Sequence, residues 1–346
     1  MKEIHDGKKA NAPDAVKQIA LVGTGTIGAA WAAHFLAQGL DVIASDPGPD
    51  AEKQMRTAVD NAWPALVQLG LAKEASRERL LFTPSIEKAV ENADFIQEST
   101  PEREAIKDQV ITVISDAAKP QVVIASSTSG IVPSRLQAQC KKPQRLLVGH
   151  PFNPVYLIPL VEVVGGEKTS PETIRWAMAF YQHWGKTPLH CRVEKLGHLA
   201  NRLQDAVFAE AMQLIADGVA TTDELDTALT AGPGLRWALT GSFLTAHMAS
   251  AGGLSDVLGG KFSASCFSHF QGPDPDDQMI ESILNTVQAQ VGGRSLKILQ
   301  QMRDEFLVGV LKLRADIKDK YNFDCSSYCP TSTPNNQDST KEKVCN

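Results

Sequence analysis

Two ionisable residues, His150 and Glu162, lie in sequence surroundings that favour a catalytic pair. His150 follows an apolar, strand-like run and precedes Pro151-Phe152-Asn153-Pro154, whose two prolines stiffen the following loop. Glu162 lies inside the apolar run 160–164, where an unpaired carboxylate would be costly. A nearby imidazole would satisfy this carboxylate, and the pair could then act as a general base with an orienting acid. A buried structural His–Glu bond is the alternative, because one sequence does not establish contact.

Hydroxyl and carboxamide side chains could complete such a site. The segment Ser126-Ser127-Thr128-Ser129-Gly130 ends another strand-like run, and open α/β sheets bind ligands beyond the carboxyl ends of their strands. Hydroxyls there could hold a substrate oxygen, although a helix N-cap explains the run equally well. Asn201 begins a long helical stretch, where its carboxamide could cap the helix or face a cleft.

The segment Gly23-Thr24-Gly25-Thr26-Ile27-Gly28 predicts a dinucleotide-binding turn. It directly follows the apolar run 19–22 and opens a helix that extends through Gln38. The first glycine permits a tight turn, the second lets a pyrophosphate approach the backbone, and the third allows the helix to pack closely on the strand. The N-terminus of the helix supplies unpaired N–H groups to the phosphates. An ordinary glycine-rich turn in an α/β protein is the alternative.

Asp46, at the end of the next strand-like run, favours NAD over NADP. A carboxylate at this place can hydrogen-bond both hydroxyls of the adenosine ribose, and it would repel a 2′-phosphate. No arginine follows at once to accept such a phosphate. Asp46-Pro47-Gly48 could also be a simple turn after the strand.

Predicted strands and predicted helices, which must carry these residues, alternate over the first part of the chain. Apolar runs suited to strands occur at residues 19–22, 41–45, 80–82, 94–97, 122–126, 146–149, 160–164 and 188–191. Helical stretches separate most of them, notably 51–69, 103–118 and 171–184. Such alternation predicts a parallel sheet with helices on both faces, which is the Rossmann-type α/β arrangement.

Beyond residue 195 the pattern is helical throughout. Helical periodicity recurs at 199–218, 222–230, 241–250, 276–290 and 295–318, and a Thr-Thr-Asp-Glu cap signal opens the second of these. We therefore predict an NAD-binding domain over 1–195 and an all-α C-terminal domain over 196–320. Residues 321–346 are rich in Ser, Thr, Pro and Asn, which predicts a disordered tail.

Composition narrows the class of protein. The 346 residues include 34 basic and 40 acidic side chains, and a net charge of −6 argues against a general nucleic-acid or membrane-surface binder. No apolar run reaches the ~18–20 residues of a membrane span, and the polar start lacks a signal-peptide core, so we expect a cytoplasmic protein. The six cysteines complete no metal spacing, although Cys325 and Cys329 leave a metal or a disulfide open in the tail.

These motifs, taken together and in order, resemble the L-3-hydroxyacyl-CoA dehydrogenase superfamily over residues 17–318. The resemblance implies a catalytic set of Ser129, His150, Glu162 and Asn201, with Asn153 in support. It also implies that Glu98 and Arg103 contact NAD. The segment Leu196-Gly197-His198 departs from the Pro-Gly-Phe that the superfamily usually has at the junction of its domains.

Within the superfamily, residues 61–66, 95–99, 149–165, 218–222 and 234–237 resemble the branch that acts on L-carnitine. The branch of L-gulonate 3-dehydrogenase and lambda-crystallin is also similar, but it tends to carry Val where this chain has Phe152. A crystallin-like structural role would need no catalysis. A hydroxyacyl-CoA substrate is a further alternative, which is weakened because residues 58–71 contain no Lys or Arg to bind the phosphates of CoA.

A carnitine substrate would require aromatic contacts, because a trimethylammonium group has no N–H to donate. The candidates are Phe152, Tyr156, Trp237 and Phe243 for the ammonium group, and Arg202 or Arg236 for the carboxylate. Each aromatic residue could instead belong to a hydrophobic core. The resemblance further implies a homodimer, which would bury part of the apolar face of 199–218.

Overall fold

The computed structural model describes residues 10–258 and 276–321, which divide into two compact units. The first unit runs to Val207 and the second begins at Phe208, so the division falls within helix α7 (Ala200–Ala216). Tyr321, where the sequence predicts the start of a tail, is the last residue of helix α12. The rest of that tail, with its three cysteines, lies outside the described residues.

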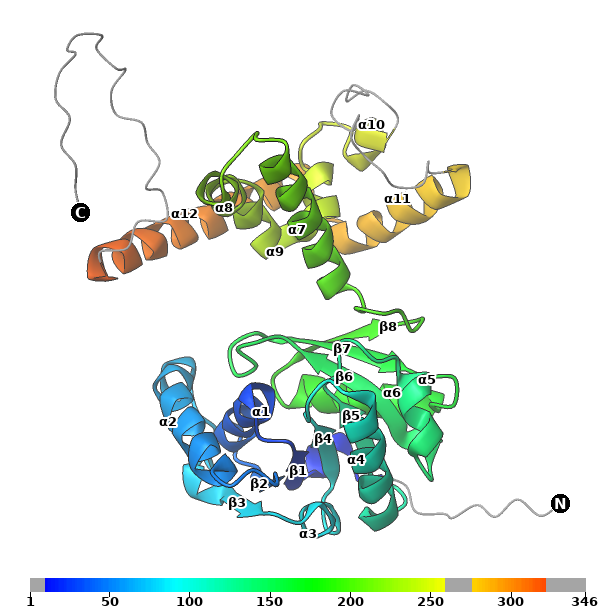
Figure 1. The fold of residues 1–346 in the computed structure, drawn as a ribbon. Coiled ribbons are helices and arrows are strands. Elements are labelled where there is room, and N and C mark those ends of the chain that lie inside the picture. Colours follow the sequence, from blue (N-terminus) through cyan, green and yellow to red (C-terminus); the bar gives the residue numbers. More distant parts are fainter. Residues whose placement is uncertain (1–9, 259–275, 322–346) are drawn as a thin grey trace. The chain divides into compact units, whose positions relative to one another are not determined.

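The first unit is built on an eight-stranded sheet with the order β3-β2-β1-β4-β5-β6-β7-β8 (Figure 1). The strands are β1 (Gln18–Val22), β2 (Asp41–Ser45), β3 (Leu80–Thr83), β4 (Phe95–Glu98), β5 (Val123–Ser126), β6 (Leu146–Pro151), β7 (Leu160–Gly165) and β8 (Thr187–Cys191). Neighbouring strands are parallel except β6 and β7, which are antiparallel. The parallel expectation is wrong for this pair because the connecting residues 152–159 are too few for a crossover.

Helices cover both faces of the sheet, as the alternating sequence pattern predicts. Helices α1 (Thr26–Ala37), α2 (Ala51–Leu69) and α6 (Pro171–His183) contribute to one core, and α3 (Ile86–Val90), α4 (Glu104–Ala117) and α5 (Pro133–Leu136) contribute to the other. Strand β1 shows the alternation directly, because Ile19 and Leu21 face the first core while Ala20 and Val22 face the second. The Rossmann-type fold class is confirmed.

The chain reverses its direction of growth across the sheet between β1 and β4. The carboxyl ends of these two strands therefore form the switch point at which open α/β sheets bind ligands. Gly23 directly follows β1, Asp46 follows β2, and Glu98 ends β4. The topology thus gathers residues from distant parts of the sequence at one edge.

The described part of the second unit is entirely helical. It contains the end of α7, α8 (Thr222–Ala231), α9 (Pro233–His247), α10 (Leu254–Leu258), α11 (Asp277–Val291) and α12 (Leu296–Tyr321). Thr221 and Glu224 form the capping box that the sequence signal before α8 predicts. Buried Met248, Leu254, Val287 and Leu299 belong to a small separate core.

Helix α9 begins earlier than its sequence pattern predicts. The periodicity placed a helix over 241–250, whereas α9 starts at Pro233 and contains a non-helical Gly241 with a φ of 63°. Gly232, Pro233 and Gly234 look like a turn in the sequence, but proline is well tolerated in the first turn of a helix. None of the helices in the described ranges is long and apolar enough to cross a membrane.

Candidate active site

The turn between β1 and α1 has the shape of a phosphate cradle. Gly23 has a φ of 93°, and a Cβ added there would lie 2.6 Å from the main chain of Ser99. A Cβ on Gly28 would lie 1.9 Å from the carbonyl oxygen of Gly23, so α1 packs directly on the turn. A Cβ on Gly25 would meet no heavy atom within 4 Å, which leaves the start of α1 open. Thr26, Ile27 and Gly28 form the first turn of α1, whose N–H groups have no helical partner, so the turn fits a pyrophosphate.

Asp46 joins this turn to the loop after β2. Its carboxylate accepts the main-chain N–H of Thr24 through Oδ2 and that of Gly48 through Oδ1, both at 2.9 Å. The first bond spans two loops and fixes the carboxylate beside the glycine turn. Asp46 therefore shapes its own turn, as the simpler interpretation predicts, and its contact with a ribose stays a prediction.

Glu98 lies at the end of β4 with its side chain fully buried. Its carboxylate accepts hydrogen bonds from Lys107 at 2.9 and 3.1 Å and from the main-chain N–H of Thr100 at 2.6 Å. The hydroxyls of Thr100 and Ser126 also donate to it. Arg103, by contrast, is exposed at the N-terminus of α4. The sequence did not single out Lys107, which is buried because it neutralises Glu98.

His150 and Glu162 meet across two neighbouring strands. They are paired residues of the antiparallel strands β6 and β7, and Nδ1 of His150 lies 2.8 Å from Oε2 of Glu162. The other carboxylate oxygen accepts the main-chain N–H groups of Leu199 and Ala200 at 2.8 and 2.9 Å. Burial acts to raise the pKa of Glu162, but these hydrogen bonds outweigh it and hold the pKa below its ordinary value.

An ionised Glu162 determines the protonation pattern of the imidazole. Because a carboxylate only accepts, Nδ1 of His150 carries the hydrogen, and the neutral ring presents Nε2 as a bare nitrogen. The side chain of His150 is 9% exposed, and the ring of Phe152 lies against it edge-on with the centroids 4.9 Å apart. The imidazole is therefore held in one orientation and is largely shielded from solvent.

The loop after β5 brings hydroxyl groups to the same edge of the sheet. Ser127 accepts or shares hydrogen bonds with Gln97 at 2.8 Å and Ser99 at 2.9 Å. Glu102, another residue that the sequence did not single out, accepts from the hydroxyl of Thr128 and from the N–H of Gly130 at 2.7 Å. Hydrogen bonds to side chains of neighbouring strands and loops therefore fix the position of this loop.

Ser129 and Asn201 have side chains that remain free for a ligand. Both are half-buried, and within the described part of the chain neither the hydroxyl of Ser129 nor the carboxamide of Asn201 has a hydrogen-bond partner. Asn201 lies in the first turn of α7, where a cap was one interpretation of its role. Glu162 accepts the free N–H groups there instead.

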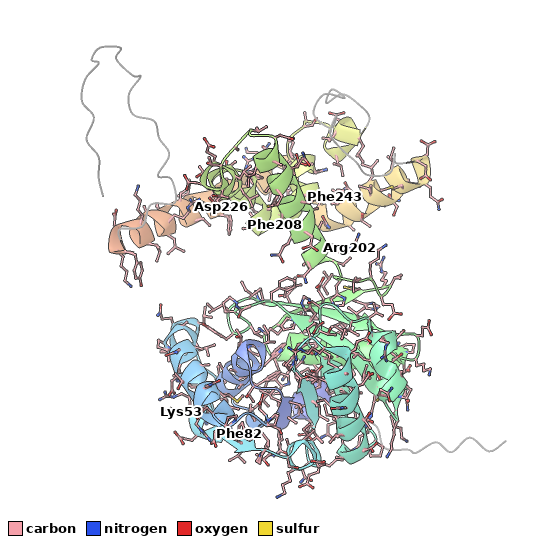
Figure 2. All side chains as sticks on the ribbon, in the orientation of Figure 1. Lys53, Phe82, Arg202, Phe208, Asp226 and Phe243 are labelled. Carbon is pink, nitrogen blue, oxygen red and sulfur yellow. The ribbon has the colours of Figure 1, made fainter. Side chains whose placement is uncertain are left out.

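The candidate substrate residues fall in different surroundings. Asn153 is exposed on the loop between β6 and β7, whereas Tyr156 packs partly against the larger core. Trp237 and Phe243 belong to α9 in the second unit and are 40% and 52% exposed. Figure 2 labels Phe243 and also Arg202, which lies on the part of α7 that belongs to the first unit.

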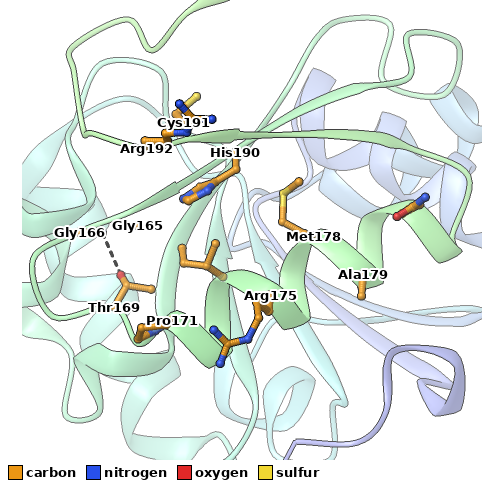
Figure 3. A pocket seen from close by; sticks show the side chains of 12 residues that line it. Gly165, Gly166, Thr169, Pro171, Arg175, Met178, Ala179, His190, Cys191 and Arg192 are labelled. Carbon is orange, nitrogen blue, oxygen red and sulfur yellow. Dashed lines mark hydrogen bonds between the residues drawn. The ribbon is translucent and has the colours of Figure 1, made fainter. Parts of the chain in front are cut away.

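A cavity of about 650 Å³ lies between α6 and β8 (Figure 3), and no residue of the Gly23–Gly28 turn lines it. Arg175, Met178 and His190 are among the side chains that line it. Cys191 also lines it, and the thiol of this residue lies 4.0 Å from Oε1 of Glu162. None of the predicted catalytic residues lines this cavity.

Comparison with known proteins places the chain in a family. A model of the NAD-binding domain of 3-hydroxyacyl-CoA dehydrogenase matches residues 18–194, and a model of the C-terminal domain of that enzyme matches residues 197–300. The chain belongs to the 3-hydroxyacyl-CoA dehydrogenase family. It is accordingly an NAD-dependent dehydrogenase of this family, and the open turn at Gly25 is consistent with NAD as its cofactor.

Relatives within the 3-hydroxyacyl-CoA dehydrogenase family are similar over most of the chain. An L-carnitine dehydrogenase of Bacillus cereus is 47% identical over 303 residues, which cover 87% of this chain and 93% of the relative. An L-carnitine dehydrogenase of Pseudomonas aeruginosa is 46% identical and covers 89% of this chain and 97% of its own length.

Two solved structures are similar in fold to this chain. The structure of 5-formyl-3-hydroxy-2-methylpyridine 4-carboxylic acid 5-dehydrogenase, an NAD+-dependent dismutase, is 28% identical. It covers 86% of this chain and 98% of its own, with a TM-score of 0.66. A 3-hydroxyacyl-CoA dehydrogenase from Archaeoglobus fulgidus, at 22% identity, covers 86% of this chain and 99% of its own with a TM-score of 0.65, which shows a shared fold.

Proposed function

We propose that this protein oxidises the 3-hydroxyl group of L-carnitine to 3-dehydrocarnitine with NAD as the oxidant. The observation that carries the proposal is the bond between Nδ1 of His150 and Glu162, which leaves Nε2 as a base. The identity of 42–47% to proteins named L-carnitine dehydrogenase supports the choice of substrate.

In the proposed reaction NAD, when bound at the Gly23–Gly28 turn, supplies the acceptor for the hydride that leaves C3. Nε2 of His150 takes the hydroxyl proton, and Glu162 stabilises the imidazolium that results. The N–H groups of Leu199 and Ala200 keep Glu162 ionised throughout. The free side chains of Ser129 and Asn201 would hydrogen-bond the substrate oxygen as it gains alkoxide character.

Recognition of carnitine requires two kinds of contact. The trimethylammonium group is best held by aromatic faces, and Phe152 is the candidate nearest the base, with its ring centroid 4.9 Å from that of His150. Tyr156, Trp237 and Phe243 are the other proposed aromatic contacts. We assign the substrate carboxylate to Arg202 or Arg236, since a guanidinium can bind it through two hydrogen bonds.

Oxidation assays with three alcohols in parallel test this function. NADH formation is measured with L-carnitine, L-gulonate and 3-hydroxybutyryl-CoA, for the wild type and for His150→Asn. We expect turnover of carnitine with the highest kcat/KM, and loss of that turnover in the variant. Preference for either other alcohol would replace the substrate assignment, and no turnover with any of them would favour a crystallin-like structural role.

We also propose that the protein is a homodimer. Leu203, Phe208 and Met212 on α7 are 71%, 68% and 53% exposed, and large apolar side chains at such density mark an interaction surface. Light scattering should give about twice the chain mass of 37.4 kDa. A mass of one chain would contradict the proposal.

A further inference from the structure

His198 occupies an unusual place between β8 and α7. It is 1% exposed, and among the described residues other than glycine it alone has a positive φ, of 51°. Gly197 before it has a φ of 76°. A residue with a side chain holds this conformation only where its surroundings favour it, and such places cluster at active sites.

The ring of His198 has one bonded nitrogen and one bare nitrogen. Nε2 lies 3.0 Å from the carbonyl oxygen of Thr128, and since a carbonyl only accepts, Nε2 carries the hydrogen. The neutral ring then has no hydrogen on Nδ1, which is buried and has no partner within the described ranges. Protonation of Nδ1 would bury an N–H group there without a hydrogen-bond partner among the described residues.

The backbone around His198 ties two parts of the site together. On one side, the N–H of Gly197 donates to the carbonyl oxygen of Ser129 at 3.2 Å. On the other side, Leu199 and Ala200 donate to Glu162. His198 is therefore the middle of a strap that runs from the loop after β5 to the carboxylate on β7.

Charged groups from several elements face this imidazole. The ring of His150 on β6 lies 5.1 Å away between centroids, and Glu162 on β7 and Glu102 before α4 also act on it. Burial lowers the pKa of His198 and His150 lowers it further, whereas the Thr128 carbonyl, Glu162 and Glu102 act to raise it without outweighing burial. A neutral His198 places no second cation beside His150 when that base takes up its proton.

We propose that His198 is a positioning residue, a neutral imidazole that fixes the Ser129 loop against the start of α7 and so aligns Ser129 and Glu162 around His150. The inference rests on the proposed role of His150 as the base. It adds a residue at a position where the resemblance to the superfamily leads one to expect phenylalanine. The donor on Nε2 is the feature that phenylalanine lacks.

Three substitutions of His198 separate the effect of the hydrogen bond from the effect of side-chain size. His198→Gln keeps an N–H donor near the place of Nε2, His198→Met has similar length without a donor, and His198→Phe keeps a ring. Loss of one positioning hydrogen bond is expected to lower kcat about tenfold in the Met and Phe variants, with the KM for NAD within about twofold. The Gln variant should restore kcat to within about threefold of wild type, and His190→Gln, on the exposed part of β8, should leave kcat unchanged.

The comparison of kcat between the Gln and Met variants tests the proposal even if the Phe variant does not fold. Equal kcat values for these two variants would overturn the proposal, because the donor would then be irrelevant. Wild-type kcat in the Phe variant would overturn it too. The role of the base is tested separately, because turnover that persists in His150→Asn refutes that role whatever the variants at 198 show.

Discussion

His150 and Glu162 are direct partners across the antiparallel strands β6 and β7, with 2.8 Å between Nδ1 and Oε2. Opposed residues of an antiparallel pair project from the same face of the sheet, so the strand register itself brings the two side chains together. Glu162 also accepts the first N–H groups of α7. One carboxylate thus orients the proposed base and fixes the start of the next helix.

Glu162→Gln should abolish most of the activity while keeping the shape of the site. The amide can accept the N–H groups of Leu199 and Ala200, but its NH2 group would then donate to Nδ1 and leave the hydrogen on Nε2, so the imidazole could not act as a base. We expect kcat to fall about 100-fold or more, with the affinity for NAD little changed. Steady-state NADH formation and NAD titration measure the two effects.

The matched control is Glu172→Gln, which removes an exposed carboxylate that pairs with Arg175 on α6. This variant should keep the wild-type kcat. If Glu162→Gln retained more than about a tenth of the wild-type kcat, orientation of His150 by a carboxylate would not be part of the mechanism.

Glu162 should also make the stability of the protein sensitive to acid. Its pKa in the folded protein lies below the ordinary value of 4.5, so the ionised form contributes stability above that pH. This contribution is lost as the pH falls through the folded pKa. The difference in Tm between wild type and Glu162→Gln should therefore be largest near neutral pH and shrink below 4.5. A difference that stays constant across this range would show that the bonds to Glu162 do not depend on its charge.

Features that depend on neighbouring residues could be predicted from the sequence. The glycine turn, the strand that precedes it and the capping box at Thr221 are local patterns, and the structure has each of them. The proposed His150–Glu162 pair could also be predicted from the sequence, because a short loop between two apolar runs brings the two residues together. The same short loop excludes a parallel β6–β7 pair, and that signal could have corrected the expected topology.

Contacts between distant segments could not be predicted in this way. His198 bonds a carbonyl 70 positions earlier, and Glu102 bonds a hydroxyl 26 positions later. Glu102 belongs to no periodic pattern or spaced motif. His198 stands out in the sequence only as a departure from the Pro-Gly-Phe of the superfamily, which does not show what its side chain contacts. Their partners become visible only when the sheet aligns the ends of its strands.

Gly25 and Gly28 should respond to alanine in different ways. The Gly25 Cβ position is open and its φ is −62°, so Gly25→Ala should fold with a Tm close to wild type. The added methyl group would occupy the approach to the helix start, and we expect the Kd for NAD to rise about tenfold or more. Gly28→Ala would place Cβ 1.9 Å from an oxygen of Gly23 and should lower the stability by about 1–3 kcal/mol. Thermal melts with and without NAD compare the two; equal loss of stability would contradict this account.

Trp237→Ala tests the proposed aromatic contact to carnitine. The side chain is 40% exposed, so its truncation should have little effect on the Tm. Loss of one cation–π contact of ~0.5–2 kcal/mol predicts a KM for carnitine that rises about 2- to 30-fold, without loss of NAD binding. Trp237→Phe keeps an aromatic face, so its KM for carnitine should lie between those of Trp237→Ala and the wild type. An unchanged KM in the alanine variant would remove Trp237 from the substrate site.

Lys186 should stabilise the conformation of the loop that follows His150. Its ammonium group is buried, lies 5.2 Å from the centroid of the Trp31 ring, and donates to the carbonyl oxygens of Val155 and Ile158. Lys186→Met would leave these two carbonyls without this donor, at a cost of about 1–3 kcal/mol for the buried carbonyl of Val155. The loop carries Phe152, so we expect a higher KM for the alcohol and an unchanged affinity for NAD.

The pH dependence of stability gives a second test of Lys186. Burial lowers the pKa of Lys186 from 10.5 to about 8. Between these values the unfolded chain binds more protons than the folded one at this site, so the contribution of Lys186 to stability rises with pH. Urea unfolding should show the difference between wild type and Lys186→Met growing from pH 8 toward 10.5. Lys73→Met, at an exposed position, should show no such growth, and a constant difference for Lys186→Met would mean that the buried ammonium keeps its ordinary pKa.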